Sequence, residues 1–359
     1  MSTDALPSAD RAGRPRADGS NSRREADRRR SRRAASLAAV GAGLLLLGLA
    51  ALLGWRGAPA PGDAPPHRYV PGHPVAADAL GPLAPLADRQ VTVRRGVVVG
   101  GATDDARKLA EFSFAESADG PVLVDWRALV DDPFLRLMPA SDELAAVSEV
   151  LARHVQAGTT VLAWWDLSRP FRLLSGVDVA FGEPLGTPLF VPRQWDARRE
   201  AVDSIEREFW QLADATEQRQ RFDRFVAALL ADEERGMAEL RTLAGGKPAV
   251  LVLHVRDAIL LGHLEPGKFG VAFRDLGDMA DVHGMVRRVH AWLDEHGYRA
   301  YTVTHAKGQP VRAVALTDEA SGETLAARLL PMIGNRQEDV AGATLVYRLG
   351  GFVVYEIGR

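Results

Sequence analysis

The feature that most constrains this chain is an uncharged stretch of 22 residues, residues 34–55, which reads AASLAAVGAGLLLLGLAALLGW. As a helix rising about 1.5 Å per residue it would be roughly 33 Å long, enough to cross a hydrocarbon core about 30 Å thick. Its glycines are compatible with that role, because glycine is common in membrane helices. Trp55 and Arg56 would anchor the far end at the interface. The stretch therefore predicts a single transmembrane helix.

The charges on either side of this stretch predict its orientation. Residues 1–33 carry ten arginines against five acidic residues, including RRRSRR at 28–33, whereas residues 57–67 contain no Lys or Arg. The positive-inside rule then leaves residues 1–33 in the cytoplasm as a disordered, Arg-rich tail and places the rest in the periplasm. The alternative is a cleaved signal peptide, although hydrophobic regions of signal peptides usually run only about 7–15 residues. The predicted location is the inner (cytoplasmic) membrane, crossed once.

The composition changes after the membrane segment. Residues 56–88 are rich in Pro, Gly and Ala and predict a linker, so residues 89–359 would form the periplasmic domain. The whole chain has a net charge of −3 and residues 1–33 contribute +5, which leaves −8 on the remainder. Such an acidic domain has no electrostatic footprint for nucleic acid. The chain has no cysteine, so disulfides and cysteine-ligated clusters are excluded.

Within that domain the hydrophobic pattern predicts alternating strands and helices. Residues 90–100 and 121–126 predict strands, and residues 141–158 predict a helix that Ser141 could cap. Residues 159–166, TTVLAWWD, form an unbroken run that is typical of a strand buried on both faces. This strand, helix and strand order predicts a parallel crossover unit.

The second half of the chain continues the alternation. Its pattern predicts helices at 198–213, 217–244, 281–297 and 322–333, a buried strand at 248–255, a hairpin from 298–306 and 310–318, and a closing strand pair around Gly350 and Gly351. The predicted fold class is α/β, with a mixed sheet.

The residues most suggestive of a site are Trp164, Trp165 and Asp166, where the buried run ends and a helix begins. Ligands of α/β sheets gather beyond the carboxyl ends of strands. Asp166 could face a crevice there, with Arg169 or Arg172 as its partner, or it could cap the following helix in a purely structural corner. Because neighbouring strand residues point to opposite faces, at most one tryptophan is expected beside Asp166.

A metal site is the weaker possibility. Asp275, Asp278, Asp281 and His283 could supply oxygen and imidazole ligands, but no fixed metal-binding spacing such as HExxH is present. The nucleophile elbow, the Walker loop and a dinucleotide-binding glycine motif are also missing. The residues therefore indicate no cofactor and no catalytic chemistry.

Four segments carry a resemblance to a known family: VLVDWRALVDDPFLRL, LAWWDLSRPFRLLSG, LHVRDAILLG with the following FGVAFRDL and DVHGMV, and the closing LVYRLGGFVVYEI. Over roughly residues 120–357, together with the single N-terminal span, the chain resembles the HaoB family, which is encoded beside hydroxylamine oxidoreductase. The resemblance implies a membrane-anchored periplasmic accessory that binds, positions or matures this multihaem enzyme. It supplies no catalytic residues.

The segment around Trp164 to Asp166 is also similar to the opening of the periplasmic domain in oligosaccharyltransferase catalytic subunits, where a WWD motif binds the acceptor peptide. The Tyr-Gly that follows the motif there is Leu167-Ser168 here. This likeness implies, as an alternative, a peptide- or glycan-binding domain or an enzyme of glycosyltransferase descent that uses the same crevice. Glycosyl transfer itself is not expected.

Overall fold

The folded part of the chain starts earlier than the sequence predicts. The computed structural model describes residues 65–89, 91–101, 107–186, 192–277, 282–305, 310–336 and 339–358, and the second of its two compact units runs from Pro65 to Arg359. The predicted tail, the membrane segment 34–55 and the first part of the linker lie outside these residues. In the described ranges no helix combines the length and the apolar character needed to span a membrane.

The linker prediction is wrong from residue 65 onwards, because part of it is a strand. β1 (His67–Pro74) pairs antiparallel with β2 (Thr92–Gly100) and forms the edge of a sheet ordered β1-β2-β3-β4. Proline is tolerated on an edge strand, where no neighbour needs its missing N–H, so the Pro-rich composition did not exclude a strand. β3 (Lys108–Ser117) and β4 (Gly120–Ala128) complete the sheet, and the turns η1 (Ala77–Ala79), η2 (Gly81–Leu83) and α2 (Pro85–Asp88) connect β1 to β2.

The centre of the fold is a mixed sheet of order β11-β12-β7-β5-β6, which confirms the predicted class. β5 (Thr160–Ala163) and β7 (Ala249–His254) are parallel neighbours and every residue of both is buried. The predicted crossover from residues 121–126 to this strand is wrong, since β4 belongs to the first sheet. β6 (Asp178–Val179) pairs parallel with β5, whereas β12 (Phe352–Ile357) and β11 (Ala343–Leu349) are antiparallel additions on the other side.

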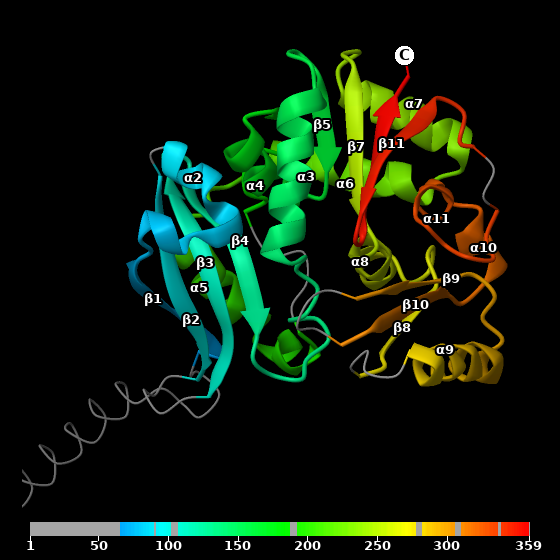
Figure 1. Ribbon diagram of the computed structural model, residues 1–359, viewed down its shortest axis with the longest axis horizontal. Helices are drawn as coiled ribbons and strands as arrows, with labels where there is room; N and C mark the ends of the chain where they lie inside the picture. The colour runs from blue at the N-terminus through cyan, green and yellow to red at the C-terminus, as the bar shows by residue number, and fades with distance from the viewer. Residues whose placement is uncertain are drawn as a thin grey trace, which may run out of the picture. The chain divides into compact units, whose positions relative to one another are not determined.

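Helices α3 (Ser141–His154) and α4 (Trp165–Ser175) lie between β4 and the mixed sheet (Figure 1). Ser141 is the first helical residue of α3 and makes no capping bond, so its predicted capping role is wrong. The helix predicted at 217–244 is two helices, α6 (Thr216–Leu230) and α7 (Glu233–Leu243). The break occurs because the Asp232 carboxylate accepts a hydrogen bond from the backbone N–H of Arg235 at 3.0 Å and starts a new helix.

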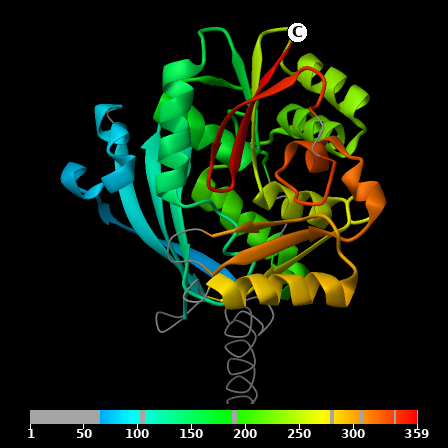
Figure 2. The same cartoon turned by 45° about the vertical axis from the view of Figure 1, so that its right-hand side comes forward.

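A smaller antiparallel sheet of order β8-β10-β9 confirms the predicted hairpin. It consists of β8 (Val271–Asp275), β10 (Arg312–Leu316) and β9 (Tyr301–Thr304), and α9 (Val282–His296) lies along it in both views (Figures 1 and 2). Val289, Trp292 and Leu293 of α9 pack on Ala313 and Ala315 of β10. The remaining helices are η3 (Arg193–Arg198), α5 (Arg199–Trp210), α8 (Arg256–Leu264), α10 (Glu319–Gly322) and α11 (Leu325–Leu329).

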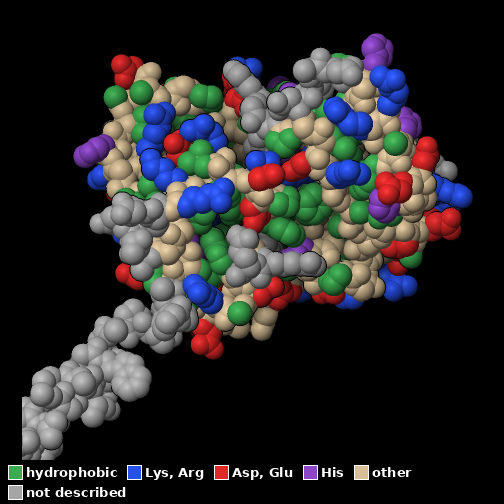
Figure 3. All heavy atoms as spheres, turned by 90° about the horizontal axis from the view of Figure 1, so that it is seen from below, with side chains coloured by type: hydrophobic (Ala, Val, Ile, Leu, Met, Phe, Trp, Pro, Cys, Tyr) green, Lys and Arg blue, Asp and Glu red, His purple; other side chains and the backbone are tan. Residues whose placement is uncertain are grey.

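On the face of the molecule seen from below, several Lys and Arg side chains gather on the left part (Figure 3). Elsewhere on this face basic and acidic side chains are interspersed, with hydrophobic side chains gathered near the middle.

Candidate functional site

The Trp-Trp-Asp segment is a sharp turn from a strand into a helix. β5 ends at Ala163, Trp164 has the extended ψ of 140° before α4, and Trp165 and Asp166 already belong to the first helical turn. The hydroxyl of Ser168 donates to the carbonyl oxygens of Ala163 and Trp164, each at 3.2 Å, and so ties the helix to the end of the strand. The prediction that the two tryptophans alternate along one strand is wrong, because the chain leaves the strand before them.

The two tryptophans lie in different surroundings. Trp164 is 1% exposed and contacts Phe222 of α6 edge to face, with 5.2 Å between the ring centres. Trp165 is only partly buried. Both nevertheless line one cavity, which contradicts the expectation that at most one would lie beside Asp166.

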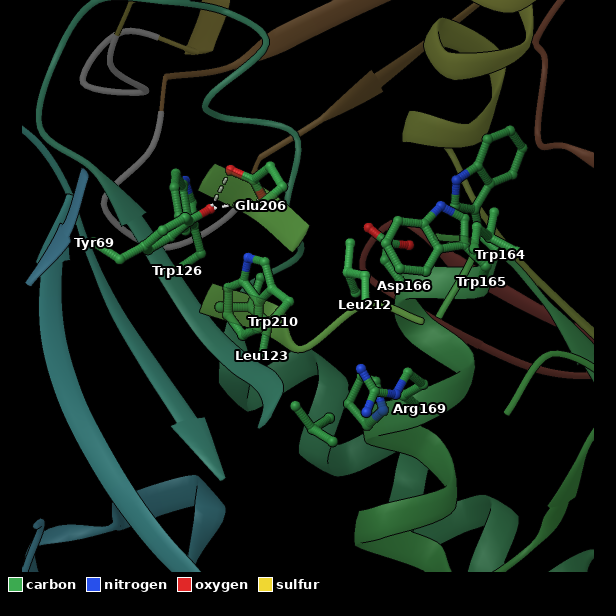
Figure 4. Close-up of a pocket in the computed structure, with 13 residues that line it drawn as sticks. Tyr69, Leu123, Trp126, Trp164, Trp165, Asp166, Arg169, Glu206, Trp210 and Leu212 are labelled. Carbon is green, nitrogen blue, oxygen red and sulfur yellow. Dashed lines mark hydrogen bonds between the residues drawn. The ribbon is translucent and has the colours of Figure 1, made fainter. Parts of the chain in front are cut away.

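This cavity, called the aromatic pocket below, has a volume of about 220 Å³. It lies between α4 on one side and β1, β4 and the end of α5 on the other (Figure 4). Most of its wall is aromatic or aliphatic, and three charged side chains interrupt it. The lining residues are Tyr69, Val122, Leu123, Trp126, Trp164, Trp165, Asp166, Arg169, Pro170, Leu185, Glu206, Trp210 and Leu212.

Glu206 is held in place on the sheet side of the pocket. The Tyr69 hydroxyl donates to its two carboxylate oxygens at 2.9 and 3.1 Å, and His67 Nε2 lies 2.9 Å from Oε1. Burial, together with the negative charge of Glu206, raises the pKa of Tyr69 well above its ordinary value of 10.0. The tyrosine therefore keeps its proton and remains a donor to Glu206 at neutral pH.

Asp166 has a different partner from the two arginines that the sequence suggested. Its carboxylate pairs with Arg256 Nη2, and the arginine side chain is 4% exposed against 28% for the aspartate. Asp166 does not cap α4, because the capping position is Trp164 and no side chain bonds there. Both the predicted capping role and the predicted pairing with Arg169 or Arg172 are therefore wrong.

Arg256 belongs to a buried polar group at the end of β7. Its Nε lies 3.6 Å from Oδ1 of Asp257, whose Oδ2 accepts a hydrogen bond from the backbone N–H of His254 at 2.9 Å. Burial raises the pKa of Asp257 to about 7, although Arg256 and the backbone bond act in the opposite direction. Burial and the charge of Arg256 lower the pKa of His254 well below 6.5. The group thus holds a neutral histidine.

Arg169 lines the pocket, and no carboxylate of the described residues pairs with it. It is 6% exposed, Nη2 donates to the backbone carbonyl of Asp119 at 2.9 Å, and Nε has no hydrogen-bond partner among the described residues. Burial lowers the pKa of Arg169 to about 10, with a further contribution from Arg172, although the negative charge of Asp119 acts in the opposite direction. Figure 4 shows its guanidinium extending from α4 into the space between that helix and the sheet.

Comparison with known proteins identifies the family. The sequence matches the family described as "HaoA-associated protein HaoB" over residues 31–357. The chain belongs to the HaoB family. No curated protein matches it. Among solved structures, the C-terminal domain of PglB from C. jejuni is similar over 59% of this chain and 100% of that domain, with 11% identity and a TM-score of 0.31, which is too weak to carry an argument.

The structure of this HaoB-family chain brings only some of the predicted site residues together. Trp164, Trp165, Asp166 and Arg169 line the pocket, and their role in binding stays a prediction. Arg172 does not line it: its side chain is 39% exposed and donates to Asp119 Oδ2 at 2.8 Å.

The weak metal candidates do not form a site in the described residues. Asp275 is bonded by Arg312, whose Nε and Nη2 donate to its two oxygens at 2.6 and 2.9 Å. His283 is exposed on α9, and Asp278 and Asp281 lie outside the described residues. Within the described ranges, no three His, Asp or Glu side chains are grouped closely enough to hold a metal ion.

Several residues of the HaoB-family pocket could not be assigned from sequence. Tyr69, Trp126, Glu206 and Trp210 are distant from the Trp-Trp-Asp segment in the chain and reach it only through the packing of the first sheet and α5. Arg256 had a usable signal: it follows a buried strand, and the carboxyl ends of parallel neighbouring strands meet at one edge of a sheet.

Proposed function

We propose that this HaoB-family chain is a membrane-anchored periplasmic accessory of hydroxylamine oxidoreductase, and that it acts by binding, to position or mature that enzyme. Membership of a family described as HaoA-associated supports the partner. The apolar segment 34–55 and the arginines before it support the membrane anchor and the periplasmic side. The proposal needs no catalytic residue in this chain.

The aromatic pocket is the recognition site in this proposal, and it is the observation that carries the binding function. Concave sites lined mainly by aromatic and aliphatic groups, with a few oriented polar groups, are typical of ligand recognition. Here Glu206 and Asp166 are fixed by hydrogen-bonded partners, so the polar groups have defined positions before any ligand arrives.

The test is capture of purified hydroxylamine oxidoreductase by the full chain in detergent, followed by titration of the complex. We expect binding by the parent chain and at least a tenfold loss for Trp165→Ala, because this substitution removes a partly exposed wall of the pocket. Ile333→Ala is the matched control, since Ile333 is 53% exposed and does not line the pocket. No binding by the parent chain would refute the accessory function.

The location is tested separately with reporters fused to the carboxyl end. We expect an alkaline phosphatase fusion to be active, because this enzyme folds only outside the cytoplasm, and a cytoplasm-only fluorescent fusion to stay dark. The reverse pattern would contradict the periplasmic assignment. Release of the domain as a shorter, soluble chain would instead favour the cleaved signal peptide.

A second function, binding of a peptide or glycan in the same pocket, is favoured by its partly exposed aromatic wall. Aromatic side chains supply large contact areas for both ligand classes. If Trp165→Ala abolishes binding of an oligosaccharide or peptide while the oxidoreductase is still captured at full strength, the pocket serves this second function rather than the first.

A further inference from the structure

We propose that the aromatic pocket takes a carboxylate joined to an apolar or aromatic group, with Arg169 as the residue that binds the carboxylate. The inference rests on the assignment of this pocket as a recognition site and names the chemistry of its ligand. It is based on the charges in the pocket, on the geometry of Arg169 and on the size of the cavity.

The charges favour an anion as the ligand. Of the three charged residues that line the pocket, Asp166 is already paired with Arg256, and Glu206 is already bonded by Tyr69 and His67. Arg169 is the one with no carboxylate within ion-pair distance among the described residues; its bond goes to a backbone carbonyl. The carboxylate of Asp119 pairs with Arg172 and acts on Arg169 only from farther away. A buried charge without an ion-pair partner is costly, so a ligand that supplies a negative group gains the most at this residue.

The geometry of Arg169 favours a carboxylate. A guanidinium presents its donors in a planar fork that matches the two oxygens of a carboxylate. Nη2 is engaged by Asp119, whereas Nε is buried and lacks a partner among the described residues, so donors remain for a ligand. The side chain, with an exposed fraction of only 6%, lies in surroundings of low dielectric where such a bond is strong.

The walls and the volume define the rest of the ligand. Trp126, Trp210 and Leu123 line the side of the pocket across from Arg169, and Trp165 lies about one turn before Arg169 on α4 itself (Figure 4). The volume of about 220 Å³ is below the range of roughly 300–1,000 Å³ that is usual for drug-sized ligands. It therefore suits one apolar or aromatic residue with its carboxylate, and not an extended segment.

Two sources could present this chemistry: a free carboxylic acid of that size, or the last residue of a polypeptide with its terminal carboxylate. The test uses calorimetry of the full chain in detergent with N-acetyl-phenylalanine and its amide. Its second arm uses a short peptide ending in phenylalanine, as the free acid, as the amide, and with the phenylalanine moved to an internal position.

We expect the acid to bind at least tenfold more tightly than the matching amide. Acid preference with N-acetyl-phenylalanine shows that the free compound suffices, and acid preference seen only with the peptide assigns the site to a chain end. Equal binding of acid and amide in both arms, or no binding of either, would overturn the proposal. This outcome is decided with the parent chain alone.

Variants then assign the preference to Arg169. Arg169→Gln should bring the acid and the amide to equal affinity, and Arg169→Lys should keep a weaker preference because it retains the charge without the fork. Arg207→Gln is the matched control: Arg207 is exposed on α5, outside the pocket lining, and its loss should leave the preference unchanged. An acid preference that survives in folded Arg169→Gln would also overturn the proposal.

The outcome for the ligand is separable from the outcome for the proposed function. If the full chain captures hydroxylamine oxidoreductase but does not distinguish acid from amide, the carboxylate inference fails and the accessory function stands. If acid preference is found and no oxidoreductase is captured, the accessory function fails and the carboxylate inference stands.

Discussion

At the scale of single residues, the neighbouring tryptophans Trp164 and Trp165 differ in how deeply they are buried. Trp164 is 1% exposed and packs against Phe222, so its contribution is to the core. Trp165 is partly exposed and forms a wall of the aromatic pocket. A large buried side chain that is cut back to alanine loses its transfer free energy and leaves a cavity, whereas a partly exposed one loses less.

This difference predicts different losses of stability. Trp164→Ala should lower the free energy of unfolding by about 3–5 kcal/mol, and Trp165→Ala by less than about 2 kcal/mol. Urea unfolding of the full chain in detergent, followed by circular dichroism, measures both. Equal losses would contradict the inference that the different burial of the two residues determines their contributions to stability.

Two buried groups at the end of β7 predict opposite responses to pH. The folded pKa of Asp257 is raised from 3.8 to about 7, so its stabilising contribution is complete below pH 4 and is lost as the pH rises to about 7. The folded pKa of His254 is lowered below 6.5, so its contribution is present above pH 6.5 and is lost as the pH falls. Between about pH 4 and 6.5 the two effects oppose each other.

Removing the titration of Asp257 should therefore reveal the pH dependence of stability that His254 contributes. In Asp257→Asn, which keeps an acceptor for the His254 backbone N–H, the free energy of unfolding should rise more steeply with pH from 4.5 to 6.5 than in the parent chain. Unfolding midpoints at a series of pH values test this. A parallel pH dependence in the two proteins would show that Asp257 does not titrate as described.

At the scale of elements, the site depends on two strands that run side by side. β5 and β7 are parallel with Ala163 opposite Val252, so the residues that follow each strand emerge at the same edge. That register brings Asp166, at the start of α4, to Arg256, at the start of α8. The pair lies 90 positions apart in sequence and connects two helices that the sequence treats separately.

The connection predicts energetic coupling between the two helices. A double-mutant cycle of Asp166→Asn and Arg256→Gln should give a coupling energy of about 1–3 kcal/mol, since one partner is almost fully buried. The exposed pair Glu149 and Arg153, with exposed fractions of 61% and 67%, is the control and should give less than about 0.5 kcal/mol. Similar values for both cycles would mean that the Asp166 pair contributes little.

At the scale of the whole folded unit, the first sheet supplies one side of the pocket and its edge strand takes part in the core. Tyr69 of β1 stacks on Phe209 of α5 with 4.2 Å between ring centres and contacts Phe112 of β3 edge to face. The same tyrosine bonds Glu206, which lies 137 positions further along the chain. Residues 65–74 are therefore part of the domain and not a spacer.

This assignment predicts where the domain can be cut. A fragment of residues 65–359 should show one cooperative thermal transition, because it retains β1 and its pairing with β2. A fragment of residues 91–359 loses that strand and the Tyr69 contacts, and should melt at a much lower temperature or without cooperativity. Equal melting temperatures and equal cooperativity of the two fragments would instead support a domain that begins near residue 89.

The sequence by itself determined the local features of the structure. Periodicity and turn residues were sufficient to predict the buried strands, most helices, the hairpin and the mixed α/β class, because each depends on a short window of the chain. The same residues also carried the resemblance to the HaoB family. The Pro-rich stretch at 67–74 was misassigned, since composition does not reveal that an edge strand tolerates proline.

Only the tertiary structure decided the pocket. The partner of Asp166, the different burial of Trp164 and Trp165, and the bond of Arg169 to a backbone carbonyl in place of a carboxylate all depend on strands and helices that are far apart in sequence. The physical reason is that the free energy of a polar or aromatic side chain is determined by its neighbours in space, and sheet register and helix packing select those neighbours.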